Sequence, residues 1–79
     1  MDQTDRAPTF GEKAVGLSFN PSGDMDVHRI KEQFAAVIDT MNNMRNANES
    51  GESKRMFSVA ITEAQTAQMW AVKAVTYRY

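Results

Sequence analysis

The segment from Phe10 to Phe34 holds the residues whose types and spacing could do chemistry. It combines aromatic rings, basic side chains and several glycines ahead of a long helical pattern. Rings can stack on nucleobases, and ammonium groups and backbone N–H groups at a helix N-terminus can bind phosphate. The combination predicts a site for a small anionic ligand with flat faces. The glycines of the segment are Gly11, Gly16 and Gly23.

The first candidates lie in the glycine-containing part of this segment. Phe10 and Phe19 could stack on bases, although an aromatic residue in a short arm more often fastens that arm onto the helices. Lys13 could bind a phosphate, and a solvated charge without a specific role is the alternative. The segment lacks the G-x-x-x-x-G-K-[ST] spacing of a nucleotide-hydrolysing loop, so that function is excluded.

Two further basic candidates lie on the helical pattern. Lys31 falls at the edge of an apolar stripe, next to Val27 and Ile38. Its stem can therefore be buried while its ammonium is presented at a groove, and a purely structural role is the more common alternative. Arg29 lies on a different side of the same helix, where solvation alone would explain it.

Catalytic and metal-binding patterns are missing from the sequence. Asp24, Asp26 and His28 invite a metal site, but only Asp24 and His28 share a helix face, so capping and surface roles are expected. The chain has one histidine, no cysteine and no serine beside a suitable base. We expect no catalytic residues, no metal ligands and no cofactor.

Length and charge narrow the possible partners. A chain of 79 residues makes one small domain and leaves much apolar surface exposed when it is alone. Without cysteines to cross-link it, oligomerisation is the expected source of further stability. A net charge of −1 disfavours polymeric nucleic acid. No signal peptide and no apolar run of about 20 residues is present, so a cytosolic protein without a membrane partner is expected.

The elements that must position the candidates can be predicted in order. Residues 1–8 are a polar leader expected to be flexible, and residues 9–79 form one helical-hairpin domain. Residues 9–23 form a short helix or an extended arm that ends in the turn Asn20–Gly23. Asp24 is the predicted N-cap of a helix over about 24–45. Its apolar residues recur every three or four positions, at Val27, Ile30, Phe34, Val37, Ile38, Met41 and Met44.

A polar connection at residues 46–53 leads into a second predicted helix over about 54–77. Small residues line this helix at spacings of three and four, namely Ala60, Ala64, Ala67, Ala71 and Ala74. Its flanking apolar residues exceed what one antiparallel neighbour can cover. Trp70 and the methionines are interpreted as core or interface residues. The pattern therefore predicts an all-α fold, an antiparallel two-helix hairpin that assembles into a compact helical homo-oligomer.

Several of these residues resemble a known family, the phage anti-CBASS cyclic-nucleotide sponges, which are small helical hairpins that sequester immune second messengers. The likeness covers most of the chain. It rests on Gly16, on the run Arg29-Ile30-Lys31, and on a pattern in the second helix. That pattern consists of Ala60, Thr62, Glu63, Gln65, Met69, Lys73 and Ala74.

The resemblance implies a homohexamer whose interfaces enclose 3′,3′-cyclic GMP-AMP (3′,3′-cGAMP) or related cyclic dinucleotides. Some members also hold cyclic trinucleotides at a separate site. The ligand would be held without cleavage in the cytoplasm of an infected bacterial host, blocking CBASS immunity. Lys31 matches a lysine that contacts ligand in the family. Leu17 stands where better-known members have an aromatic residue, so Phe19 or Phe10 would have to stack on the base.

The predicted ligand-binding set contains Lys31, Phe10, Lys13, Gly16, Leu17, Phe19 and Arg29. The main alternative is a structural oligomerisation or adaptor module that binds no nucleotide, in which the glycine-containing arm only pads a subunit contact. A regulator that binds nucleic acid is a third option, which the charge balance argues against.

Overall fold

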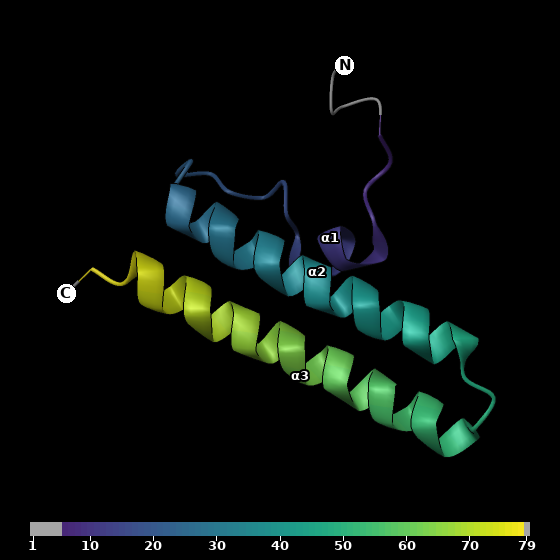
Figure 1. Ribbon diagram of the computed structural model, residues 1–79. Coiled ribbons are helices and arrows are strands. Elements are labelled where there is room, and N and C mark those ends of the chain that lie inside the picture. The colour runs from purple at the N-terminus through teal and green to yellow at the C-terminus, as the bar shows by residue number, and fades with distance from the viewer. Residues whose placement is uncertain (1–5, 79) are drawn as a thin grey trace.

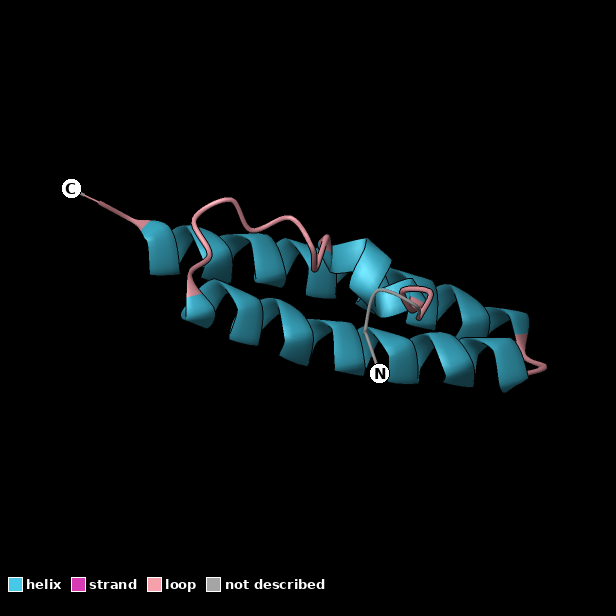
Figure 2. Ribbon diagram, turned by 90° about the horizontal axis from the view of Figure 1, so that it is seen from above, coloured by secondary structure: helices cyan, strands magenta, loops and turns pink. Residues whose placement is uncertain are grey.

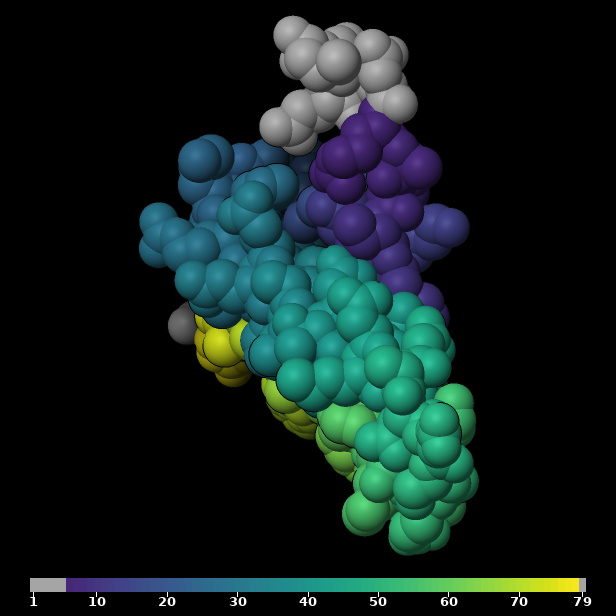
Figure 3. All heavy atoms as spheres, turned by 45° about the vertical axis from the view of Figure 1, so that its right-hand side comes forward, coloured from purple at the N-terminus to yellow at the C-terminus, as the bar shows by residue number. Residues whose placement is uncertain are grey.

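Three helices make up the part of the chain that the structure, a computed structural model, describes, residues 6–78. They are α1 (Phe10–Val15), α2 (Met25–Ala47) and α3 (Gly51–Thr76) (Figure 1). α2 and α3 run antiparallel as a hairpin, and α1 packs mainly on α2 (Figures 1 and 3). No strand occurs within residues 6–78, and the predicted all-α hairpin is confirmed for this part of the chain.

α1 is a short helix with well-formed ends. Thr9 and Glu12 form a capping box, in which each side chain accepts a hydrogen bond from the other residue's backbone N–H. Gly16 ends the helix in the left-handed conformation, with φ of 62°, which favours glycine. The alternative of an extended arm is therefore not what the chain adopts here.

α2 begins where the sequence predicts. The carboxylate of Asp24 accepts hydrogen bonds from the backbone N–H groups of Asp26 and Val27, so Asp24 is the N-cap. Between α1 and α2, the connecting loop (residues 16–24) runs beside the first half of α2, at the opposite end of the molecule from the hairpin turn (Figure 2).

The hairpin turn is shorter than the sequence suggests. α2 continues to Ala47 and α3 begins at Gly51, so the connection is residues 48–50 rather than 46–53. The hydroxyl of Ser50 caps α3 by accepting from the N–H of Ser53, and the N–H of Asn48 donates to the carbonyl of Arg45. These caps let the flanking polar residues remain helical. Residues 1–5 of the predicted leader lie outside the described residues.

The core is small and is shared by all three helices. Ile38 of α2 is completely buried at its centre. The buried apolar residues are Val15, Val27, Ala35, Ile38 and Ile61. Large apolar side chains stay exposed on both long helices, namely Met25, Val37, Met44, Met56, Val59, Met69 and Trp70. Trp70 is 67% exposed, so it is not a core residue of this chain.

The backbone of α1 packs directly against the backbone of α2 at Gly11. The N–H of Gly11 donates to Oδ1 of Asp39 at 2.7 Å. A Cβ atom at Gly11 would lie 2.1 Å from the carbonyl oxygen of Ala35, so only glycine fits this contact. From α3, Nε2 of Gln65 donates to the carbonyl of Ala14 at 3.2 Å.

No helix within residues 6–78 could span a bilayer.

Candidate functional site

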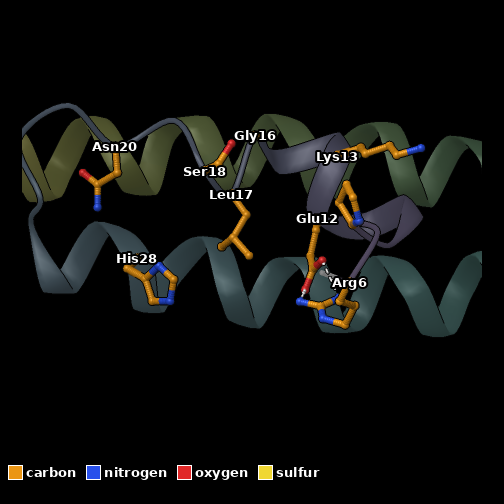
Figure 4. A pocket seen from close by; sticks show the side chains of 9 residues that line it. Arg6, Glu12, Lys13, Gly16, Leu17, Ser18, Asn20 and His28 are labelled. Atoms are coloured by element: carbon orange, nitrogen blue, oxygen red, sulfur yellow. Dashed lines mark hydrogen bonds and ion pairs between the residues drawn. The ribbon is translucent and has the colours of Figure 1, made fainter. Parts of the chain in front are cut away.

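A hollow of about 640 Å³ opens beside α1 and the first residues of the connecting loop (Figure 4). We call it the α1 hollow. This volume lies in the usual range of small-molecule sites. The hollow is lined by Arg6, Pro8, Glu12, Lys13, Gly16, Leu17, Ser18, Asn20 and His28.

Three of the predicted ligand-binding residues meet at the α1 hollow. Lys13, Gly16 and Leu17 all line it. In Figure 4 the side chain of Leu17 points toward α2, whereas Lys13 extends along α1 away from the other labelled side chains. The lysine is exposed, so its ammonium sits at the edge of the hollow rather than inside it.

Lys31 is buried directly beneath the connecting loop. Lys31 is only 6% exposed, and its Nζ donates to the carbonyl oxygens of Gly16 at 3.0 Å and Phe19 at 2.5 Å. No carboxylate within residues 6–78 forms an ion pair with it. Burial of the stem agrees with the sequence analysis. The ammonium, however, is bound by loop carbonyls.

A second hollow is lined by the later residues of the same loop. Its volume is about 290 Å³, and we call it the Phe19 hollow. Phe19 is 72% exposed, and the centroid of its ring is 5.5 Å from Nζ of Lys31, a cation–π distance. The hollow is lined by Phe19, Asn20, Pro21, Ser22, Val27, Lys31, Val72 and Thr76. One loop therefore walls two hollows, with Lys31 below it.

The remaining predicted residues lie elsewhere on the chain. The Phe10 ring is 43% exposed, and the guanidinium carbon of Arg45 is 5.5 Å from its centroid. Arg29 is exposed, with its guanidinium 3.4 Å from a carboxylate oxygen of Asp26. Neither residue lines either hollow of the single chain.

Several lining residues escaped the sequence analysis. Glu12 could have been found as the fourth residue of a capping box that begins at Thr9. His28 was predicted to be a surface residue rather than a metal ligand, and its imidazole lies 3.8 Å from the carboxylate of Glu32. Arg6 belongs to the predicted leader, and nothing local marks it as a lining residue.

Arg6 and Glu12 neutralise one another at the edge of the α1 hollow. Nη1 and Nη2 of Arg6 donate to Oε1 and Oε2 of Glu12, each at 3.0 Å. This hydrogen bond to Arg6, followed by the one from the Thr9 backbone, lowers the pKa of Glu12, and the same pairing raises the pKa of Arg6. Lys13 also lines this hollow, and it forms no ion pair with a carboxylate of residues 6–78.

Acid should loosen the beginning of α1. Because the pKa of Glu12 in the folded chain lies below its usual 4.5, the contact adds stability above that pH. The contribution is lost as pH falls through the lowered pKa. We expect the amide signals of Thr9 and Glu12 to shift in an NMR titration below pH 4.5. In Glu12→Gln, which keeps a capping oxygen without a titrating group, they should not. Equal shifts in both proteins would contradict the assignment.

These features define a class of protein, a small all-helical hairpin with two hollows lined by one loop. The chain belongs to the anti-CBASS Acb2/Tad1 family, because the family model described as "Acb2/Tad1, hairpin domain" matches residues 12–76. Members of this family are cyclic-nucleotide sponges, which act by binding rather than as enzymes. The resemblance drawn from the sequence is thereby confirmed. Comparison with curated proteins and with solved structures gives no significant match.

Proposed function

We propose that this chain sequesters cyclic oligonucleotide second messengers without cleaving them and so blocks CBASS immunity in the cytoplasm of an infected bacterium. The preferred ligands are 3′,3′-cGAMP and related cyclic dinucleotides, with cyclic trinucleotides as further candidates. The observation that carries the proposal is the match of the hairpin-domain family over residues 12–76.

The two hollows support a ligand with two bases and two phosphates. We assign Lys31 and Phe19 to the part of the ligand site at the Phe19 hollow, and Lys13, Gly16 and Leu17 to the part at the α1 hollow. Stacking contributes about 1–3 kcal/mol per base, and hydrogen bonds to charged groups about 1.5–3 kcal/mol each. The exposed Phe19 ring is the candidate for stacking, because Leu17 has no aromatic face.

Enclosure of the ligand requires more than one copy of the chain. Association costs roughly 4–15 kcal/mol, so tight capture needs a pocket that is already formed and largely closed. Both hollows are open on the single chain, and a neighbouring copy could close them. We therefore propose a homo-oligomer, a hexamer, held by the exposed apolar side chains of α2 and α3. In this assembly Phe10 and Arg29 would reach a ligand from another protomer.

An adaptor without nucleotide binding is the competing function. It is favoured by the position of the Lys31 ammonium, which loop carbonyls already engage. It also accounts for the exposed apolar residues without any ligand. Under this alternative the protein assembles, and neither it nor Lys31→Ala binds a cyclic nucleotide.

Calorimetric titration with a panel of cyclic di- and trinucleotides tests the proposal. We expect saturable binding of at least one cyclic dinucleotide, and recovery of that ligand intact after the protein is denatured. A linear dinucleotide and a DNA duplex serve as controls and should bind weakly or not at all. Recovered fragments would indicate a phosphodiesterase. Assembly seen by light scattering without any binding heat would indicate the adaptor.

A further inference from the structure

Charged side chains of α2 hold α1 at both of its ends. At the first turn, the carboxylate of Asp39 accepts from the N–H of Gly11 at 2.7 Å. At the other end, Nζ of Lys31 donates at 3.0 Å to the carbonyl of Gly16, the C-cap residue. A helix carries partial positive charge at its N-terminus and partial negative charge at its C-terminus, so both contacts have the stabilising sign.

We propose that Asp39 and Lys31 are positioning residues of the ligand site, forming a clamp that holds α1 and the turn from Gly16 to Phe19 as a preformed wall. This inference rests on the proposed function and deepens it. It assigns a role to Asp39, which lines neither hollow. It also assigns Lys31 an action through the loop, separate from any contact with a phosphate.

α1 needs such a clamp because it cannot hold itself in place. It has six residues, far fewer than the roughly 12–15 that an isolated helix needs for marginal stability. Only Gly11 and Val15 of this helix are buried. At Gly11 the two helices meet backbone to backbone, without side chains that interlock, because a Cβ there would lie 2.1 Å from the carbonyl oxygen of Ala35. Side-chain hydrogen bonds to the backbone of α1 therefore help to set its position.

Lys31 also fixes the turn that follows α1. The N–H of Phe19 donates to the carbonyl of Gly16 at 2.9 Å, and the ammonium binds the carbonyls of both residues. Two of the three ammonium donors are thus used on this turn. This turn determines the position of the Phe19 ring, which is the candidate for base stacking. A wall that is already ordered lowers the entropy lost on binding.

Two substitutions at Asp39 test the clamp, because the clamp and simple charge removal predict opposite changes in ligand affinity for one of them. Asp39→Ala and Asp39→Asn both remove a negative charge, and on Coulomb's law alone both should strengthen binding of an anionic ligand. The clamp predicts the reverse for Asp39→Ala, a loss of affinity for 3′,3′-cGAMP of roughly tenfold or more. Asp39→Asn should bind close to the unmodified protein, because its amide oxygen still accepts from Gly11.

Hydrogen exchange of the α1 amides gives a second readout that needs no ligand. We expect faster exchange over residues 12–16 in Asp39→Ala and in Lys31→Met, and little change in Asp39→Asn. Exchange within the α2–α3 hairpin should stay the same in all three, which separates loss of position from general unfolding. If the unmodified protein binds no cyclic nucleotide, the proposed function fails, and these exchange rates still decide whether the clamp exists.

Two results would overturn the clamp. One is unchanged α1 exchange in both Asp39→Ala and Lys31→Met. The other is unchanged or tighter binding by Asp39→Ala while Lys31→Met loses capture, which would mean that the ammonium acts only by direct contact with the ligand.

Discussion

Lys31→Glu should abolish capture of cyclic dinucleotides. Lys31 is 6% exposed, and its ammonium binds the carbonyl oxygens of Gly16 and Phe19. A carboxylate in its place would face the same two oxygens without a proton to donate. A hydrogen bond to a charged group contributes about 1.5–3 kcal/mol, so losing both of these contacts costs roughly 3 kcal/mol or more. If that loss falls on the turn and the site, affinity drops by about a hundredfold or more. Calorimetry with 3′,3′-cGAMP measures the loss.

Lys54→Glu is the matched control for this variant. It makes the same change of charge at an exposed lysine beside the hairpin turn, whose Nζ donates to the carbonyl of Arg45. We expect it to bind normally. Light scattering should show that Lys31→Glu keeps the assembly of the unmodified protein, because Lys31 is buried beneath the loop and is not one of the exposed apolar residues that are proposed to hold the assembly. Normal binding by Lys31→Glu would mean that the site assignment is wrong.

Gly11→Ala should detach α1 from α2. The added Cβ would lie 2.1 Å from the carbonyl oxygen of Ala35 and 2.9 Å from its carbonyl carbon, and neither backbone atom can move aside as a side chain would. Overpacking of this kind costs about 1–3 kcal/mol. For a domain of this size, 1 kcal/mol lowers Tm by roughly 4–8 °C. Thermal unfolding should show this fall, and the α1 amides should lose their protection from exchange.

Gly51→Ala provides the contrast at the start of α3. Nothing lies within 4 Å of the Cβ that this change would add. A glycine that can become alanine without strain usually gains about 0.4–1 kcal/mol, because the unfolded chain has less freedom to lose. Gly51→Ala should therefore melt at or above the temperature of the unmodified protein. If Gly11→Ala melts with it, α1 does not pack on α2 as described.

Local sequence patterns were sufficient for the two long helices and for the beginning of α2. The spacing of apolar residues from Val27 onward predicted α2, and Asp24 proved to be its N-cap. The hairpin turn was predicted too long, because polar residues on both sides of residues 48–50 are also compatible with helix. The short motifs around Gly16 and Lys31 were enough to suggest the family that the hairpin-domain match then confirmed.

The candidate site was predicted less completely, because its residues meet through contacts between distant parts of the chain. The spacing around Lys31 shows that its stem faces the apolar stripe, but not what its ammonium meets. That depends on a turn 12 to 15 residues earlier in the chain. In the same way, Phe10 and Arg29 belong to the segment that suggested a ligand site, yet in the folded chain neither residue lines either hollow.

By itself, then, the sequence was enough to predict the helical hairpin, the N-cap of α2 and the family. The helices and that cap depend on neighbours within about one turn of helix, and the family rests on short motifs along the chain. Only the tertiary structure decided how α1 is held. No residue near Asp39 in the sequence indicates its contact with α1, because its partner Gly11 is 28 residues away. The need for glycine at that position arises from the Ala35 backbone on another helix. Such contacts depend on how the elements pack, which no local pattern of residue types encodes.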